Sequence, residues 1–304
     1  MAAGAIRRLT ADDAAALATF IERAADAGDM LGSSAPHGEW VVRYALSDPG
    51  QVAIAVDATG TLIGIVLPEA KALVVEPAHR RLGIGRALVN EALNIERERG
   101  RPNLIAGVLP GDAPGHAFIE ATGFAFHSTL WDLDLEPGVA VPGPAWPRGM
   151  LARPFDRDRD LPAWVELFNA AFVDHATPLQ LDVERLQADA TDAPFLSEDL
   201  VLLEAAPGAL AGFCATEPKR LPDGGVEPRG EIWTVGVHPS HQGRGYGRQL
   251  LRWGIEHLRA LGVATVTLSV NGRNAGALGL YESEGFHRTS TRERWARPVA
   301  PVGR

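Results

Sequence analysis

The strongest constraint on the fold of this chain is that part of its sequence occurs twice. Residues 75–88 read VEPAHRRLGIGRAL, and residues 237–250 read VHPSHQGRGYGRQL. The shared glycines lie 245 − 83 = 162 residues apart, and the pair Gly-Phe at 123–124 recurs at 285–286 with the same offset. Two matches in one register rarely arise by chance, so the sequence predicts a duplicated fold.

A segment rich in proline and glycine, residues 137–149, separates the two copies. Because proline cannot continue a helix or a central strand, this segment is predicted to be a linker. A chain of 304 residues is also long enough for two domains of ordinary size. We therefore expect an N-terminal domain over residues 1–136 and a C-terminal domain over residues 150–304.

Composition and charge narrow the environment and the partners. The chain is 46% hydrophobic and 22% charged, as is typical of a soluble globular protein. It has no apolar stretch of roughly 18 residues and no signal-peptide core after Arg7 and Arg8. The lone cysteine, Cys214, lies in an apolar run, so it is expected to be buried and fits a reducing cytoplasm.

The net charge of −9 disfavours nucleic acid as a partner, because phosphate binding relies on basic surface. The histidines and the cysteine show no ligand spacing for zinc, so no metal is expected. We expect a cytoplasmic monomer or homodimer that does not bind membranes.

Residue patterns predict both strands and helices in the second copy. The predicted strands cover residues 231–237 and 265–270, and the predicted helices cover residues 248–261 and 274–283. Helices are also predicted near the start of each copy, over residues 12–27 and 161–172. Helices between strands indicate an α/β fold with a mixed sheet.

The repeated glycine loop joins a predicted strand to a predicted helix. Glycines allow the backbone to approach a ligand, and the first N–H groups of a helix point outward at the positive end of its dipole. Such a loop suits a diphosphate, to which Arg244 and Arg248 would add positive charge. A turn without a ligand is the alternative. The loop lacks the Gly-Lys-Ser/Thr of a Walker loop and the G-x-G-x-x-G spacing of a dinucleotide site.

The remaining pattern is Q/R-x-x-G-x-G/A, which occurs as Arg80-x-x-Gly83-x-Gly85 and as Gln242-x-x-Gly245-x-Gly247. Over about residues 69–135 and 231–296, both copies resemble the GNAT superfamily of N-acetyltransferases, in which this loop holds the pyrophosphate of acetyl-CoA. The resemblance implies two tandem acyl-CoA N-acyltransferase domains. Each would have a splayed, mostly antiparallel sheet with the cofactor between two parting strands.

The resemblance also implies which residues bind acetyl-CoA, the acyl donor. In the second copy these are Val235, Gly236, Val237, Gln242, Gly243, Arg244, Gly245, Tyr246, Gly247, Arg248 and Asn274. In the first copy they are Leu73, Val74, Val75, Arg80, Arg81, Leu82, Gly83, Ile84, Gly85 and Arg86.

Amide formation from a thioester needs a base for the amine, a donor for the oxyanion and an acid for the thiolate. The family resemblance favours Glu231 as the base, although it could be an ordinary carboxylate at a strand end. A backbone N–H near Val237 would stabilise the oxyanion, with Gly236 permitting a bulge. Tyr281 is the candidate acid, since a phenol with a pKa of about 10 suits a departing thiolate. Its alternative role is a core aromatic.

Asn274 lies seven residues before Tyr281, on the same helical face, and could either bind the pantetheine arm or cap its helix. The first copy has different residues at these positions. Subtracting 162 places Glu69, Asp112 and Ile119 where the second copy has Glu231, Asn274 and Tyr281. Isoleucine has no proton to donate.

Pro110 and Pro114 are expected to disturb the start of the last helix of the first copy. The first copy is therefore expected to keep a loop able to bind a CoA-type ligand without catalysing transfer.

An incomplete first copy followed by an intact second copy resembles the mycothiol synthase family, which acetylates the amine of a cysteinyl-glucosaminyl-inositol. Residues 230–237, GEIWTVGV, are similar to that family's strand before the loop, but His238 stands where the family usually has Asp. His79 and His241 are expected to be surface histidines of the two loops. Trp233 is expected to pack in the core rather than line the acceptor site.

These features predict an N-acetyltransferase that moves an acetyl group from acetyl-CoA to a primary amine of a small molecule by direct attack. The alternative is a non-catalytic tandem protein that senses acyl-CoA, since the loop persists in a copy without the tyrosine.

Overall fold

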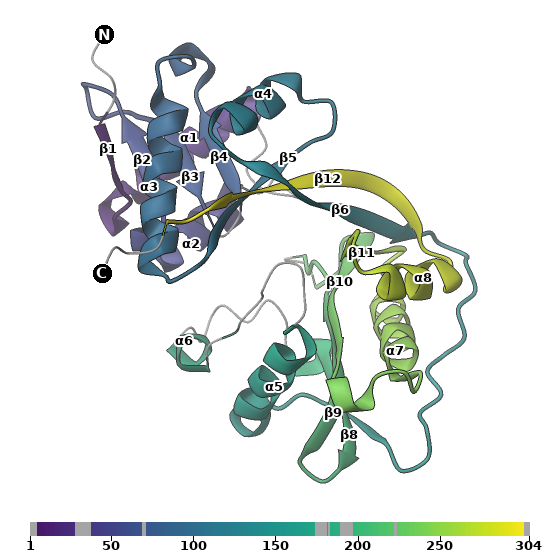
Figure 1. Ribbon diagram of the computed structural model, residues 1–304. Helices are drawn as coiled ribbons and strands as arrows, with labels where there is room; N and C mark the ends of the chain where they lie inside the picture. Colours follow the sequence, from purple (N-terminus) through teal and green to yellow (C-terminus); the bar gives the residue numbers. More distant parts are fainter. Residues whose placement is uncertain are drawn as a thin grey trace. The chain divides into compact units, whose positions relative to one another are not determined.

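The computed structural model describes residues 5–27, 38–68, 71–173, 181, 183–188, 197–221 and 224–300. The chain forms two compact units (Figure 1). Unit 1 comprises residues 1–128 and 292–304, and unit 2 comprises residues 129–291. Each unit contains strands and helices, so the α/β class predicted from the sequence is confirmed.

Unit 1 has a four-stranded antiparallel sheet in the order β1-β2-β3-β4. Its strands are β1 (Ala5–Arg8), β2 (Ala53–Val56), β3 (Leu62–Leu67), β4 (Ala72–Val75) and β5 (Asn103–Val108). Its helices are α1 (Ala14–Asp26), α2 (Gly38–Ser47), α3 (Ile84–Glu98) and α4 (Ala113–Ala121), with short 3-10 turns η1 (Ala11–Asp13), η2 (Pro49–Gln51) and η3 (Pro77–His79).

Unit 2 is built around the neighbouring strands β7 (Leu151–Pro154), β8 (Leu200–Ala206), β9 (Ala209–Glu217), β10 (Arg229–Val237) and β11 (Thr265–Asn271). Its helices are α5 (Arg157–Ala171), α6 (Val183–Ala188), α7 (Tyr246–Ala260) and α8 (Ala275–Ser283), with short 3-10 turns η4 (Ser197–Asp199) and η5 (Pro239–His241). Helix α5 covers one face of β8 to β10 and α7 covers the other (Figure 1).

Two long strands pass from one unit to the other. Strand β6 (Ala125–Leu135) follows α4 of the first copy, yet its residues 130–135 pair with β11 in unit 2. Strand β12 (His287–Pro298) follows α8 of the second copy, yet its residues 293–298 pair with β5 in unit 1. Each unit is thus completed by the last strand of the other copy. The compact units are therefore bounded differently from the predicted division, and residues 137–149 lie in unit 2.

The two copies match element by element. Helices α3 and α7 have 15 residues each, α4 and α8 have 9 each, and each pair is offset by 246 − 84 = 275 − 113 = 162. The expectation that Pro114 disturbs α4 is wrong. Pro114 lies in the first helical turn, where the missing N–H has no intrahelical partner to lose.

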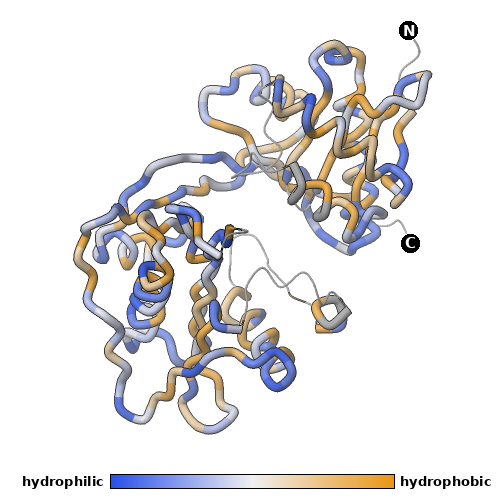
Figure 2. The backbone as a smooth tube through the Cα atoms, turned by 180° about the vertical axis from the view of Figure 1, so that it is seen from behind, coloured by the Kyte–Doolittle hydropathy of each residue, from blue (hydrophilic) through white to orange (hydrophobic). Residues whose placement is uncertain are grey.

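The core of unit 2 forms on both faces of its sheet. Leu250, Leu251 and Leu258 of α7 are buried against one face, and Phe168 of α5 packs on Phe213 at the other. Figure 2 shows these central strands as predominantly hydrophobic. Because a strand buried on both faces must be apolar at almost every position, this pattern fixes β9 as a central strand.

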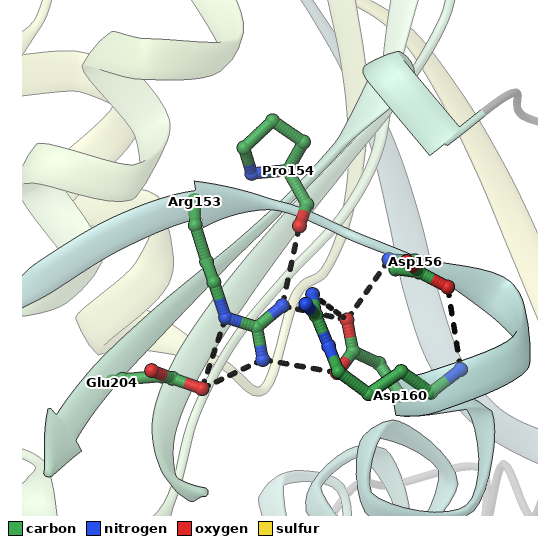
Figure 3. A network of polar contacts seen from close by, with 6 residues as sticks. Arg153, Pro154, Asp156, Asp160 and Glu204 are labelled. Carbon is green, nitrogen blue, oxygen red and sulfur yellow. Dashed lines mark hydrogen bonds and ion pairs between the residues drawn. The ribbon is translucent and has the colours of Figure 1, made fainter. Parts of the chain in front are cut away.

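A buried ion-pair network fixes the start of α5 (Figure 3). Arg153 of β7 donates two hydrogen bonds to Asp160, of 2.6 and 3.0 Å, and another of 2.6 Å to Glu204 of β8. Asp160 also accepts a 2.9 Å hydrogen bond from the backbone N–H of Asp156. Although burial opposes it, hydrogen bonding to Arg159 and Arg153 keeps the pKa of Asp160 below its usual range. The network joins α5 to two strands and so orients the aromatic face of the helix.

Candidate active site

The central strands of unit 2 part at Glu231. Strand β10 pairs in parallel with β11 through three residue pairs, from Arg229–Thr265 to Glu231–Thr267. Its antiparallel pairing with β9 continues as far as Val237. Beyond Glu231, β10 therefore presents a backbone edge on the side from which β11 has turned away. The parting strands implied by the family resemblance are present in this unit.

A bulge follows the parting point. The register between β10 and β9 shifts between Ile232 and Thr234, so Trp233 is the extra residue. The bulge that Gly236 was expected to permit near Val237 lies instead at Trp233. A Cβ atom on Gly236 would lie 2.3 Å from a ring carbon of Phe213, so glycine is needed there for close packing.

The alternation of side chains places the candidate base on the α5 face of β10. Ile232 and Val235 belong to the core beneath α7, whereas the Trp233 ring stacks on Phe168 of α5 with centroids 6.0 Å apart. Glu231 precedes Ile232 and therefore points to the same face as Trp233. Its side chain is half-buried. Trp233 is 36% exposed, so the expected core packing of this ring is only partial.

Tyr281 approaches β10 from the other face. Its ring lies 6.1 Å from that of Phe286 and packs on the core that contains Val235 and Cys214. Burial, with a smaller contribution from Cys214, raises the pKa of Tyr281 to about 12. The phenol thus carries its proton at neutral pH. Cys214 itself is buried, as predicted, and burial raises the pKa of its thiol.

The glycine loop of unit 2 presents a row of backbone donors. Gly243 and Gly245 have positive φ angles of 73° and 81°, and Gly245 caps the N-terminus of α7. Within the described part of the chain, no hydrogen bond has a backbone N–H of residues 243–247 as its donor. Five consecutive N–H groups at the positive end of a helix dipole form a site suited to an anion.

The first residue of the loop motif has a structural role that sequence analysis missed. Gln242 donates from Nε2 to the carbonyl oxygen of Val237 at 3.1 Å, and Arg80 donates from Nε to that of Val75 at 2.8 Å. Both side chains bind the last residue of the strand before the loop. The only sequence signal was that glutamine and arginine both carry an N–H donor at the same offset.

Three predicted ligands of the second copy already have partners in the protein. Asn274 accepts a 3.0 Å hydrogen bond from the backbone N–H of Ala277, so of its two expected roles the structure shows the helix cap. Arg248 forms an ion pair with Glu284. Arg244 donates to the carbonyl oxygen of Ser240 at 3.2 Å and is exposed.

The first copy keeps the loop and has an isoleucine in place of the candidate acid. Arg81 and Gly83 have positive φ angles of 65° and 84°, matching Gly243 and Gly245. Asp112 caps α4 as Asn274 caps α8, through a 3.0 Å hydrogen bond from Gly115. Ile119 is buried in the core at the position of Tyr281. Glu69 lies outside the described residues.

The other predicted ligands of the first copy are divided between core and surface. The side chains of Val74, Val75 and Ile84 are buried in the hydrophobic core, so only their backbone is available to a cofactor. Leu82 is exposed.

The loop histidines have local partners. His238, which stands where Asp is usual, accepts a 3.2 Å hydrogen bond from the backbone N–H of Ser240 through Nδ1. It therefore caps η5 as a carboxylate would. His79 Nδ1 lies 3.1 Å from a carboxylate oxygen of Glu76, and the ring centroid of His241 lies 6.1 Å from that of His238 and 6.2 Å from that of Tyr246.

Sequence comparison gives the family. The profile of the "Acetyltransferase (GNAT) family" matches residues 29–124 and 161–286. The chain belongs to this family. A mycothiol acetyltransferase of Kytococcus sedentarius is 31% identical over 300 residues, covering 96% of each chain. Those of Thermobispora bispora and Thermomonospora curvata are 35% and 39% identical, covering 73% and 71% of this chain and 73% and 69% of theirs.

Solved structures share the tandem fold. A GCN5-related N-acetyltransferase from Sphaerobacter thermophilus superposes with a TM-score of 0.67 at 24% identity, covering 98% of this chain and 96% of that one. A tandem GNAT protein from the clavulanic acid biosynthesis pathway gives 0.65 at 20% identity, covering 98% and 99%.

The GNAT chain is thus an acetyltransferase that acts on an amine. The comparisons give no support to a non-catalytic sensor. Among the described residues, no helix combines the length and apolar character needed to cross a membrane.

Proposed function

We propose that unit 2 transfers the acetyl group of acetyl-CoA to the cysteinyl amine of a cysteinyl-glucosaminyl-inositol. The observation that carries the proposal is the position of Glu231 where β10 and β11 part, with Tyr281 packed on the opposite face of β10. The acceptor is suggested by the relatives named mycothiol acetyltransferases, one of which aligns along almost its whole length.

Acetyl-CoA would bind along the parting strands. The backbone N–H groups of residues 243–247 suit its diphosphate, and the backbone of residues 235–237, beyond the pairing of β10 with β11, suits the amides of its pantetheine arm. Arg244, which lies within the loop and is exposed, adds positive charge. Arg248 is already neutralised by Glu284, so its contribution to diphosphate binding is expected to be small.

The reaction follows from the two faces of β10. Glu231 accepts a proton from the ammonium group of the acceptor, directly or through water. The free amine attacks the thioester carbonyl carbon, forming a C–N bond, while a backbone N–H near Val237 stabilises the oxyanion. The tetrahedral intermediate breaks its C–S bond, and Tyr281 donates its phenolic proton to the departing thiolate. The nitrogen releases its second excess proton to water, which leaves a neutral amide, and the phenolate of Tyr281 takes a proton back from water. No covalent enzyme intermediate is needed.

The first copy is proposed to be non-catalytic. It keeps the loop conformation at Arg81 and Gly83, but Ile119 has no proton to donate. Its last strand, β6, also completes the sheet of unit 2, so the copy contributes structurally to the site.

The test is acetylation of cysteinyl-glucosaminyl-inositol by the purified full chain. Because this acceptor carries a thiol, product and free CoA are measured by liquid chromatography with mass detection rather than by a thiol reagent. The matched acceptor is glucosaminyl-inositol, which lacks the cysteinyl amine and is expected to remain unmodified. The double variant Glu231→Gln, Tyr281→Phe is expected to lose turnover. Equal acetylation of both acceptors would contradict the acceptor assignment, and unchanged turnover in the double variant would contradict the mechanism.

A further inference from the structure

Glu284 is a buried carboxylate held between two helices of unit 2. Its side chain is 2% exposed. Arg252 of α7 donates to it from Nε at 2.8 Å and from Nη2 at 3.0 Å, and Arg248 of α7 pairs with the same carboxylate. Arg248 also donates to the hydroxyl of Ser283 at 3.0 Å. A buried charge of this kind is tolerated because both arginines compensate it.

The partners of Glu284 connect the two halves of the proposed site. Arg248 lies in the first turn of α7, immediately after the glycine loop. Glu284 is the C-cap of α8 and lies one helical turn after Tyr281. The carbonyl oxygen of Tyr281 accepts hydrogen bonds of 3.1 Å from the backbone N–H groups of both Glu284 and Phe286. The backbone of Tyr281 is therefore hydrogen-bonded directly to Glu284, the residue that forms ion pairs with Arg248 and Arg252 of α7.

We call the ion pairs of Glu284 with Arg248 and Arg252 the clamp. The first copy has the same backbone turn but no acidic residue at the position of Glu284. The carbonyl oxygen of Ile119 accepts from Thr122 and Phe124, as that of Tyr281 does from Glu284 and Phe286. At the clamp position, however, Thr122 donates its hydroxyl within its own helix, to the carbonyl oxygen of Phe118 at 2.8 Å. The position of Arg252 is occupied there by Asn90. The turn forms without the clamp, and the clamp occurs in the copy that has the tyrosine.

We propose that Glu284 is a positioning residue that holds α8 against the first turn of α7 and so sets the place of the Tyr281 phenol relative to the glycine loop. This inference rests on the proposed role of Tyr281 as the acid. A displacement of about 1 Å at a reacting group can cost about 100-fold in rate, so a fixed helix spacing matters for proton donation. Glu284 itself need not touch either substrate.

The experiment is a double-mutant cycle in the full chain. Glu284→Gln is introduced into the wild type and into a Tyr281→Phe background, and kcat, the KM for acetyl-CoA and the thermal midpoint are measured with cysteinyl-glucosaminyl-inositol. Glu282→Gln is the matched control, because Glu282 is a half-exposed carboxylate on the same helix, paired with Arg288 at 3.2 Å. If Glu284→Gln does not fold, Arg252→Gln removes the bidentate partner and is measured in the same two backgrounds.

We expect Glu284→Gln to lower kcat about 10-fold when Tyr281 is present and less than about 2-fold in the Tyr281→Phe background, because non-additivity reports that two residues act together. Glu282→Gln should leave kcat unchanged. An equal loss in both backgrounds, or no loss in either, would overturn the positioning role while leaving the acid assignment intact. A Tyr281→Phe variant with wild-type kcat would overturn the acid assignment and, with it, this inference.

Discussion

Glu231 is the last residue of β10 that pairs with β11, and its register partner there is Thr267. The strands separate immediately after this pair, so the candidate base lies where a ligand could enter between them. Replacing Glu231 by Gln is expected to lower kcat/KM for the amine about 100- to 1,000-fold, because it removes a general base. Steady-state kinetics check this, with Glu227→Gln as the control, since Glu227 is a partly exposed carboxylate just before β10. A loss below about 3-fold would show that Glu231 is not the base.

The pKa of Tyr281, raised to about 12 by burial, determines the alkaline limit expected for its role. The phenol donates a proton only while it is protonated, so activity that depends on it is lost as pH rises through that pKa. We expect kcat to stay level between about pH 8 and pH 10, whereas an ordinary tyrosine with a pKa of about 10 would be half ionised at the upper value. The pH profile of kcat tests this, and a half-loss near pH 10 would contradict it. Tyr281→Phe should lower kcat about 100-fold across the range.

Gly245→Glu is expected to abolish acetyl-CoA binding to unit 2. Gly245 has a φ of 81°, where a side chain is strained, and a glutamate there would repel a diphosphate. Isothermal titration calorimetry with acetyl-CoA should show one site fewer than in the wild type. Gly208→Glu is the matched control, since Gly208 has a φ of 79° in the turn between β8 and β9. Equal site numbers in wild type and Gly245→Glu would refute the assignment of this loop.

His116 and Glu293 should make the stability of unit 1 depend on pH. His116 of α4 lies 2.9 Å from Glu293 of β12, and this hydrogen bond is the main cause that raises the pKa of His116 and lowers that of Glu293. The stabilisation from His116 is complete below its ordinary pKa of 6.5 and is lost as pH rises through the raised value. That from Glu293 is present above its ordinary pKa of 4.5 and is lost as pH falls through its lowered value. The pair is therefore strongest between these two ordinary values.

The measurement is the thermal midpoint of wild type and His116→Gln at about pH 6 and about pH 9. The gap between the two proteins should be larger at the lower pH, because the imidazolium is then present. The same gap at both values would show that the pair does not titrate in this range.

Because residues 130–135 of β6 complete the sheet of unit 2, a fragment that begins at the linker is expected to be less stable than one that includes β6. A fragment of residues 137–304 lacks residues 130–135 of β6, which pair with β11 and bury Leu133 and Leu135. A fragment of residues 125–304 retains them. Since each buried leucine contributes about 2–5 kcal/mol, the shorter fragment should be less stable by about 4 kcal/mol or more. Urea unfolding of both fragments decides this, and equal midpoints would contradict it.

The sequence by itself determined the duplication, the two glycine loops and the presence of Ile119 at the position of Tyr281, and it offered a helix cap as one of two roles for Asn274. These features are local: a left-handed turn needs glycine at Gly245, and a helix cap needs a short polar side chain such as Asn274 or Asp112. They therefore appear as residue types at fixed spacing, and the offset of 162 carried them from one copy to the other.

Only the tertiary structure decided the exchange of β6 and β12, the bulge at Trp233 and the pairing of Glu284 with two arginines. Each depends on a register or contact between segments distant in the chain, such as Leu135 with Val266. Any amphipathic strand can satisfy the hydrogen bonds of a sheet edge, so local pattern does not specify which strand will do so. The pairing of β6 with β11 is instead decided by how the hydrophobic cores pack. The sheet of the second copy is thereby completed by a strand of the first copy.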